Sequence, residues 1–235
     1  MKKKIASAVF LICLYSGAAE AQSFAFGDHW YNNPLGFSPL ELHAANGFLI
    51  PAAAVTACLL LTNNDTSLTN RYSFYNEDGV SWGYKIPYTT LFQDNIGITY
   101  GLRRWMQAGA ELSFYFPRDE YNNTAGIGIR PFARFFPVNG ENWRLYFECG
   151  AGLIYFFDNF PKSTYADPRL GTYLNATSKY GIGSGVNLDK STSLVFGVRH
   201  IHVSNGNLEG SNRNPSHDSN GFFIGFTYEP RRSLP

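Results

Sequence analysis

The sequence predicts an all-β fold, an eight-stranded antiparallel transmembrane β-barrel of the bacterial outer membrane. Apolar and polar residues alternate with period two in several segments after residue 93, which is a strand signal. Aromatic residues make up 17% of the chain, and no segment after the N-terminus is a long uninterrupted apolar helix. A closed barrel lets such strands enter a bilayer with every backbone group hydrogen-bonded.

The N-terminus is typical of a cleaved secretory signal. Three lysines precede a short apolar run, and an Ala-x-Ala sequence ends at Ala21. The run is too short for a membrane anchor. We therefore expect a signal peptide at 1–21 and a single β-barrel domain at 22–235, in which 22–93 is poorly assigned.

Seven segments between 94 and 228 show the alternation, with apolar residues on one face and glycine or polar residues on the other. For example, Phe147 and Cys149 alternate with Glu148 and Gly150. A soluble β-sandwich would also alternate. The connections favour the membrane barrel, because short ones near 104, 140 and 190 alternate with longer ones near 120, 165 and 212, as periplasmic turns alternate with external loops.

An even strand count requires an eighth strand upstream. The candidates are Leu40–Pro51 and Gly83–Phe92, and the sequence leaves the choice between them open. The stretch 52–82 contains turn-like sequences such as Asn76-Glu77-Asp78-Gly79. Inside the barrel we expect a packed ionic core formed by Arg130, Arg134, Glu111 and Glu148.

Composition limits the partners and cofactors. The formal net charge is +1, which gives no electrostatic reason to expect nucleic acid. Cys58 and Cys149 remain after the signal; they either pair or serve as small buried residues, the latter interpretation being favoured for Cys149. No Cys-His spacing indicates zinc, and no cofactor is expected.

The last hairpin carries reactive side chains. In its first strand, the lipid-facing parity marked by Phe196 continues through His202 to Ser204. In its second strand, counting back by twos from Phe222 reaches Asp218. A base, a hydroxyl and a carboxylate are therefore predicted to converge on the outer face near the external rim.

This set predicts a Ser-His-acid hydrolase. Ser204 is the candidate nucleophile, His202 the base that removes its proton, and Asp218 the acid that orients the imidazole. Asn205 and Asn214 are candidates to support the oxyanion.

Four alternatives stay open. His200, which shares the face, is a second candidate base, and Glu209 is a reserve acid. A metal site formed by His200, His202, His217 and Asp218 is a further possibility. In the last alternative, His202 and Ser204 have no catalytic role and are rim residues of a structural hairpin.

The segments RHIHVSNG (199–206) and NPSHDSNGF (214–222) resemble the lipid A 3-O-deacylase (PagL) family, also called acyloxyacyl hydrolases. The resemblance covers 199–228 and implies an eight-stranded barrel with a His-x-Ser-Asn motif, in which His202 is the base, Ser204 the nucleophile and Asn214 an oxyanion donor. The family's acid is Glu in its best-known members and corresponds here to Asp218.

The implied function is an outer-membrane esterase that removes an ester-linked acyl chain, at the 3-O position, from lipid A. Its partners would be lipopolysaccharide and outer-membrane lipid, and a homodimer is possible. The alternative function is a non-catalytic small barrel with structural or adhesive external loops. The sequence leaves open which acyl chain is removed.

Overall fold

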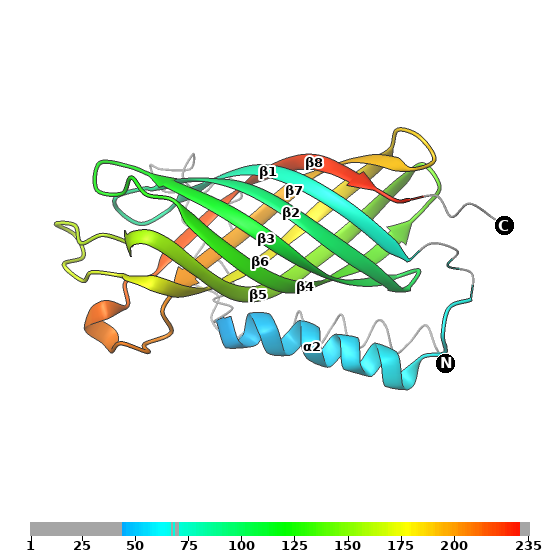
Figure 1. Ribbon diagram of the computed structural model, residues 1–235, viewed down its shortest axis with the longest axis horizontal. Helices are drawn as coiled ribbons and strands as arrows, with labels where there is room; N and C mark the ends of the chain where they lie inside the picture. The colour runs from blue at the N-terminus through cyan, green and yellow to red at the C-terminus, as the bar shows by residue number, and fades with distance from the viewer. Residues whose placement is uncertain (1–43, 67, 69–70, 231–235) are drawn as a thin grey trace, which may run out of the picture.

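The computed structural model describes residues 44–66, 68 and 71–230, which contain one closed β-barrel (Figure 1). Eight antiparallel strands follow one another around the barrel, and β8 closes against β1. The strands are β1 (Tyr72–Gly83), β2 (Thr90–Arg103), β3 (Met106–Arg118), β4 (Gly126–Asn139), β5 (Trp143–Phe160), β6 (Thr172–Asn187), β7 (Thr192–Ser204) and β8 (His217–Tyr228). The predicted fold is confirmed, and the seven alternating segments are β2–β8. The predicted signal peptide lies outside the described residues.

The barrel has one end with short turns and one end with long loops. Residues 104–105, 140–142 and 188–191 form the short turns, whereas 84–89, 119–125, 161–171 and 205–216 form the loops. Figure 1 shows the loops, including the one with the short helix η1 (Ser211–Arg213), at the left end. Because external loops are the longer ones in outer-membrane barrels, the left end faces outside the cell. The β7–β8 connection therefore lies at the outer rim.

The eighth strand is β1, so both predicted candidates were wrong. Gly83–Phe92 covers the end of β1, a loop and the start of β2, and the described part of Leu40–Pro51 is helical. Strand β1 escaped detection because its outer face carries Asn76 and Asp78, where other strands carry apolar residues. Asn76 donates a hydrogen bond of 2.9 Å to Asp94 on the outer face of β2. The polar run predicted as a turn is therefore strand.

Helix α2 (Ala44–Leu61) lies outside the barrel, along β4, β5 and β6 (Figure 1). The segment is apolar on all sides and rich in alanine, a strong helix former, so no period-two pattern exists for a strand to use. Within the described part of the chain, no helix is both long enough and apolar enough to cross a membrane.

The C-terminal end of α2 is fixed to the barrel. The guanidinium of Arg103 donates hydrogen bonds to the carbonyl oxygen of Cys58 at 3.3 Å, and to the carbonyl oxygen and Oγ1 of Thr62, both at 2.8 Å. Cys58 also packs into an apolar cluster with Leu102, Met106 and Ala133. No disulfide joins Cys58 to Cys149, and both thiols are buried.

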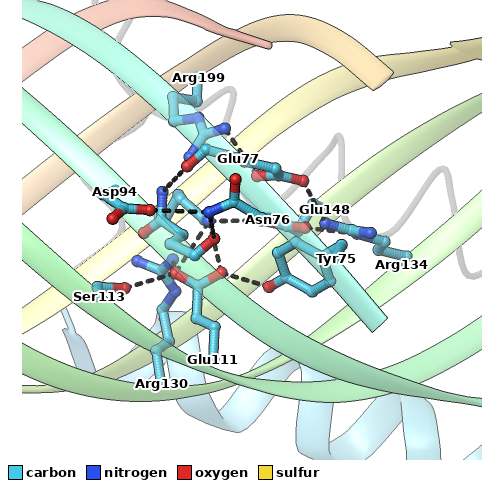
Figure 2. A network of polar contacts seen from close by, with 12 residues as sticks. Tyr75, Asn76, Glu77, Asp94, Glu111, Ser113, Arg130, Arg134, Glu148 and Arg199 are labelled. Atoms are coloured by element: carbon cyan, nitrogen blue, oxygen red, sulfur yellow. Dashed lines mark hydrogen bonds and ion pairs between the residues drawn. The ribbon is translucent and has the colours of Figure 1, made fainter. Parts of the chain in front are cut away.

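The barrel interior is filled in three layers. An apolar cluster fills the outer end, and a smaller one of Phe136, Tyr146 and Phe223 lies toward the periplasmic end. Between them lies an ionic network (Figure 2). In it Arg134 binds Glu77 at 2.7 Å and Glu148 at 2.6 Å. Arg130 and Lys179 pair with Glu111, Lys179 also pairs with Glu148, and Arg199 pairs with Glu77. The predicted ionic core is confirmed and is larger than the sequence indicated.

Candidate active site

Strand β7 presents one face to the core and the other to the outside. Ile201 and Val203 are fully buried in the apolar cluster at the outer end of the interior. Because successive side chains point to opposite faces, His202 and Ser204 must lie on the outer face. The packed core behind the strand holds these two side chains at fixed positions, as parity predicted.

Three candidate residues form a hydrogen-bonded chain with His202 in the middle. Nε2 of His202 lies 2.9 Å from Oγ of Ser204, and Nδ1 of His202 lies 2.6 Å from Oδ1 of Asp218. His202 and Asp218 are directly opposite across the β7–β8 ladder. Direct pairing explains how the short side chain of Asp218 reaches the imidazole. Ser204 and Asp218 are each only 7% exposed, so the contacts are largely shielded from water.

Asp218 is held by a second set of contacts that the sequence did not predict. Its Oδ2 accepts hydrogen bonds from Nζ of Lys85 at 3.0 Å and from Oγ of Ser216 at 3.2 Å. Lys85 comes from the β1–β2 loop, and it also donates to Ser216 at 3.1 Å. The two carboxylate oxygens therefore have separate tasks, because one accepts from the imidazole and the other is anchored to the rim.

His200 lies beside the acid and away from the nucleophile. Its Nδ1 is 2.9 Å from Oδ1 of Asn220, and its Nε2 is 3.7 Å from Oδ1 of Asp218. Its ring lies 4.8 Å from Tyr180 and 6.3 Å from Tyr84, centroid to centroid, and is buried. The structure therefore brings His202, and not His200, to the serine hydroxyl.

The side chains named for a metal site are divided between the two faces of the barrel wall. His217 is buried, and its ring lies 5.3 Å from that of Phe160, which belongs to the interior cluster. In the described ranges, no group of three or more His, Cys, Asp or Glu side chains is placed to hold a metal ion.

The two asparagines organise the β7–β8 loop. Oδ1 of Asn214 accepts from the backbone N–H of Asn205 at 2.9 Å, and its Nδ2 donates to Oδ1 of Asn207 at 2.9 Å. The Nδ2 of Asn205 donates to the carbonyl of Arg213 at 2.6 Å. In this geometry both side-chain amides cross-link the loop next to Ser204. Their role as oxyanion donors stays a prediction.

Glu209, the alternative candidate for the acid, lies elsewhere in the β7–β8 loop. The carboxylate of Glu209 is 3.7 Å from Nε of Arg213, and its side chain is 58% exposed. Among the candidate acids, Asp218 is the one hydrogen-bonded to the imidazole of His202.

The arrangement is suited to acyl transfer. A hydroxyl whose proton is accepted by an imidazole, itself oriented by a carboxylate, is an activated nucleophile for a carbonyl carbon. The three side chains lie on the outer face of the barrel wall, at the outer rim.

Comparison with known proteins identifies the relatives. A family model for lipid A 3-O-deacylase (PagL) matches residues 77–227, which is more than half of the chain. The crystal structure of the outer membrane enzyme PagL matches with a TM-score of 0.50 and 16% identity, covering 64% of this chain and 97% of that chain. Neisserial surface protein A matches with a TM-score of 0.52 and 10% identity, covering 68% of this chain and 97% of that chain. No curated protein sequence matches. At these identities the structural likenesses support the fold alone.

Proposed function

The chain belongs to the lipid A 3-O-deacylase (PagL) family of outer-membrane ester hydrolases, and from this premise we propose that it releases the 3-O-linked acyl chain of lipid A through Ser204, His202 and Asp218. The observation that carries the proposal is the continuous hydrogen-bonded relay from Oγ of Ser204 through the imidazole to Asp218. A purely structural barrel needs no such relay on its outer face.

The reaction would proceed through an acyl-enzyme. Oγ of Ser204 attacks the ester carbonyl carbon while Nε2 of His202 accepts the hydroxyl proton. The tetrahedral intermediate collapses as His202 returns that proton to the departing sugar oxygen. Water then attacks the acyl-enzyme with His202 again as the base, which releases the fatty acid and restores the serine. Asp218 keeps Nδ1 protonated, so that Nε2 is free to accept.

The position of the relay suits this substrate. The outer leaflet of the outer membrane contains lipopolysaccharide, whose acyl chains lie in the hydrocarbon and whose sugars lie at the surface. A site on the outer wall at the rim meets the ester between these two regions. The acyl chain therefore need not leave the membrane before the bond is cut.

Mass spectrometry of lipid A from cells that express the protein tests the proposal. We expect the wild type to remove one 3-O-acyl chain and Ser204→Ala to remove none. Ser184→Ala is the matched control, because Ser184 lies on the outward face of β6 and donates only to the carbonyl of Arg144. If the wild type, correctly assembled in the outer membrane, leaves lipid A unchanged, the proposed activity is wrong. Deacylation that survives Ser204→Ala would refute the nucleophile.

A further inference from the structure

A line of directly opposed residues leads away from Ser204 across the outer wall. Ser204 of β7 is paired with Ala176 of β6, Ala176 with Leu153 of β5, and Leu153 with Ile129 of β4. All four side chains face outward. Three interstrand spacings correspond to roughly 14 Å of barrel surface. The nucleophile is therefore connected to the middle of the β4–β6 wall by an unbroken apolar path.

The path descends into the membrane. Continued around the barrel from Ile129, the same line of opposed residues returns to β7 at Leu194, ten residues closer to the periplasmic end than Ser204. Each step from β7 toward β4 therefore moves away from the rim. An acyl chain that follows this line would run from the ester at the surface into the hydrocarbon.

The opposite direction from Ser204 is already occupied. On the β8 side lie the imidazole of His202 and the carboxylate of Asp218, with Lys85 hydrogen-bonded to the latter. The groups on this side of the serine are therefore polar or charged, which is unfavourable for methylenes. An acyl group whose carbonyl is at Ser204 is expected to extend over β6, where the opposed residues are apolar.

The path ends in an apolar groove between the barrel wall and α2. The groove has a volume of about 380 Å³. The barrel side of the groove includes Ala151 and Ala176, whose small side chains leave space above the strands. The opposite side of the groove is formed by the ring of Phe48, in the N-terminal half of α2. The lining residues include Phe48, Ile129, Pro131, Ala151, Leu153 and Ala176.

Helix α2, which forms the far side of the groove, is anchored to the barrel at its C-terminal end. Arg103 and the cluster around Cys58 attach its C-terminal end to the barrel, so the position of Phe48 depends on one anchored 18-residue helix. The helix also lies outside residues 77–227, the part of the chain that the family model matches. The groove wall is therefore an addition to the shared barrel.

We propose that α2 and the β4–β6 wall form the binding groove for the acyl chain of the substrate ester, and that Phe48 makes the enzyme selective for long chains. The inference rests on the proposed ester hydrolysis at Ser204. In the bound state the carbonyl lies at Ser204, the first methylenes cross Ala176, and the distal methylenes lie between Leu153 and Phe48.

Two chromogenic esters, p-nitrophenyl butyrate and p-nitrophenyl laurate, test the groove with the full-length protein, both presented in the same detergent micelles. The readout is the ratio of kcat/KM for laurate to that for butyrate. Ala176→Phe places a ring on the path and is expected to lower the ratio about tenfold, since each methylene displaced from apolar contact is worth about fourfold in binding. Phe48→Ala removes the far side and is expected to lower the ratio about fourfold, the equivalent of one methylene.

Matched controls separate the groove from general effects on the membrane face. Val186→Phe adds the same ring to the same face of β6, ten residues nearer the periplasmic end, and Leu60→Ala shortens a side chain of α2 that is 78% exposed. Both should keep the wild-type ratio.

The possible outcomes distinguish the two proposals. Hydrolysis that Ser204→Ala abolishes, combined with an unchanged ratio in Ala176→Phe and Phe48→Ala, would overturn the groove and leave the esterase intact. Equal losses on both esters would also overturn it. A wild type that hydrolyses neither ester and leaves lipid A unchanged would remove the esterase and the groove together. If Ala176→Phe does not assemble, Phe48→Ala decides alone, because Phe48 lies outside the barrel strands.

Discussion

The anchoring of Asp218 by Lys85 predicts an unusual pair of mutational effects. In Asp218→Asn one carboxylate oxygen becomes an NH₂ group, which must face either His202 or Lys85. Lys85 can only donate, so the amide will turn its oxygen toward Lys85 and its NH₂ toward Nδ1 of His202. The imidazole then carries its proton on Nε2, which points at Ser204 and can no longer accept from it.

The expected cost follows from the loss of the base. A wrong imidazole tautomer in a Ser-His-Asp triad lowers kcat by about 10⁴, so we expect Asp218→Asn to lose on the order of a thousandfold or more, ~4 kcal/mol. Lys85→Met alone should lose less than about threefold. Its side chain is 56% exposed, exposed ion pairs are worth about 0–1 kcal/mol, and Ser216 still holds the carboxylate.

The double variant is the decisive measurement. Without Lys85, the NH₂ of Asn at position 218 can donate to Oγ of Ser216, and its oxygen can turn back to Nδ1 of His202. We therefore expect Lys85→Met with Asp218→Asn to hydrolyse p-nitrophenyl butyrate at least tenfold faster than Asp218→Asn alone. If the double variant is as slow as, or slower than, the single Asn variant, Lys85 does not orient the acid and the argument fails.

Three further predictions concern the loop and the interior. Asn214→Ala removes the two loop hydrogen bonds made by the Asn214 side chain, so trypsin should cleave after Arg213 about tenfold faster than in wild type, and an unchanged cleavage rate would contradict the role of Asn214. Glu209→Ala should keep activity within about twofold, because its ion pair is exposed; a loss as large as that of Asp218→Asn would make Glu209 the acid. Glu77→Gln removes the carboxylate that Arg134 and Arg199 share and should lower the free energy of unfolding by about 3 kcal/mol, measured from the urea midpoint, while the folded fraction keeps its activity.

The outer-face alternation made most of the barrel predictable from sequence. Strands β2–β8 direct apolar residues toward the lipid, so their period-two pattern can be recognised from the amino-acid sequence alone. Strand β1 was not predicted because Asn76 and Asp78 face outward. A rule that expects only apolar residues on the outward face interprets such a polar segment as a turn. Backbone pairing with β2 and β8, which closes the barrel, makes this segment a strand although its outer face is partly polar.

The candidate site was predictable to the extent that it depends on strand parity. His202 and Ser204 are on one strand, and Asp218 keeps extended geometry at the start of β8, so counting by twos reached all three. Lys85 and Ser216 could not be predicted, because their contacts with the acid depend on how two loops fold over the rim. The homodimer stays a prediction.

The pairing register between β7 and β8 determines which side chains meet in the candidate site. Because the side-chain period of a strand is two, a slip of one residue between β7 and β8 would exchange the two faces of one strand. The carboxylate of Asp218 would then face the apolar cluster around Ile201, and His217 would be brought opposite His202. Burial of a charge without a partner costs several kcal/mol, so the interior that rejects this slip also keeps Asp218 opposite His202. The packed inner face of the hairpin thus maintains the relay on its outer face.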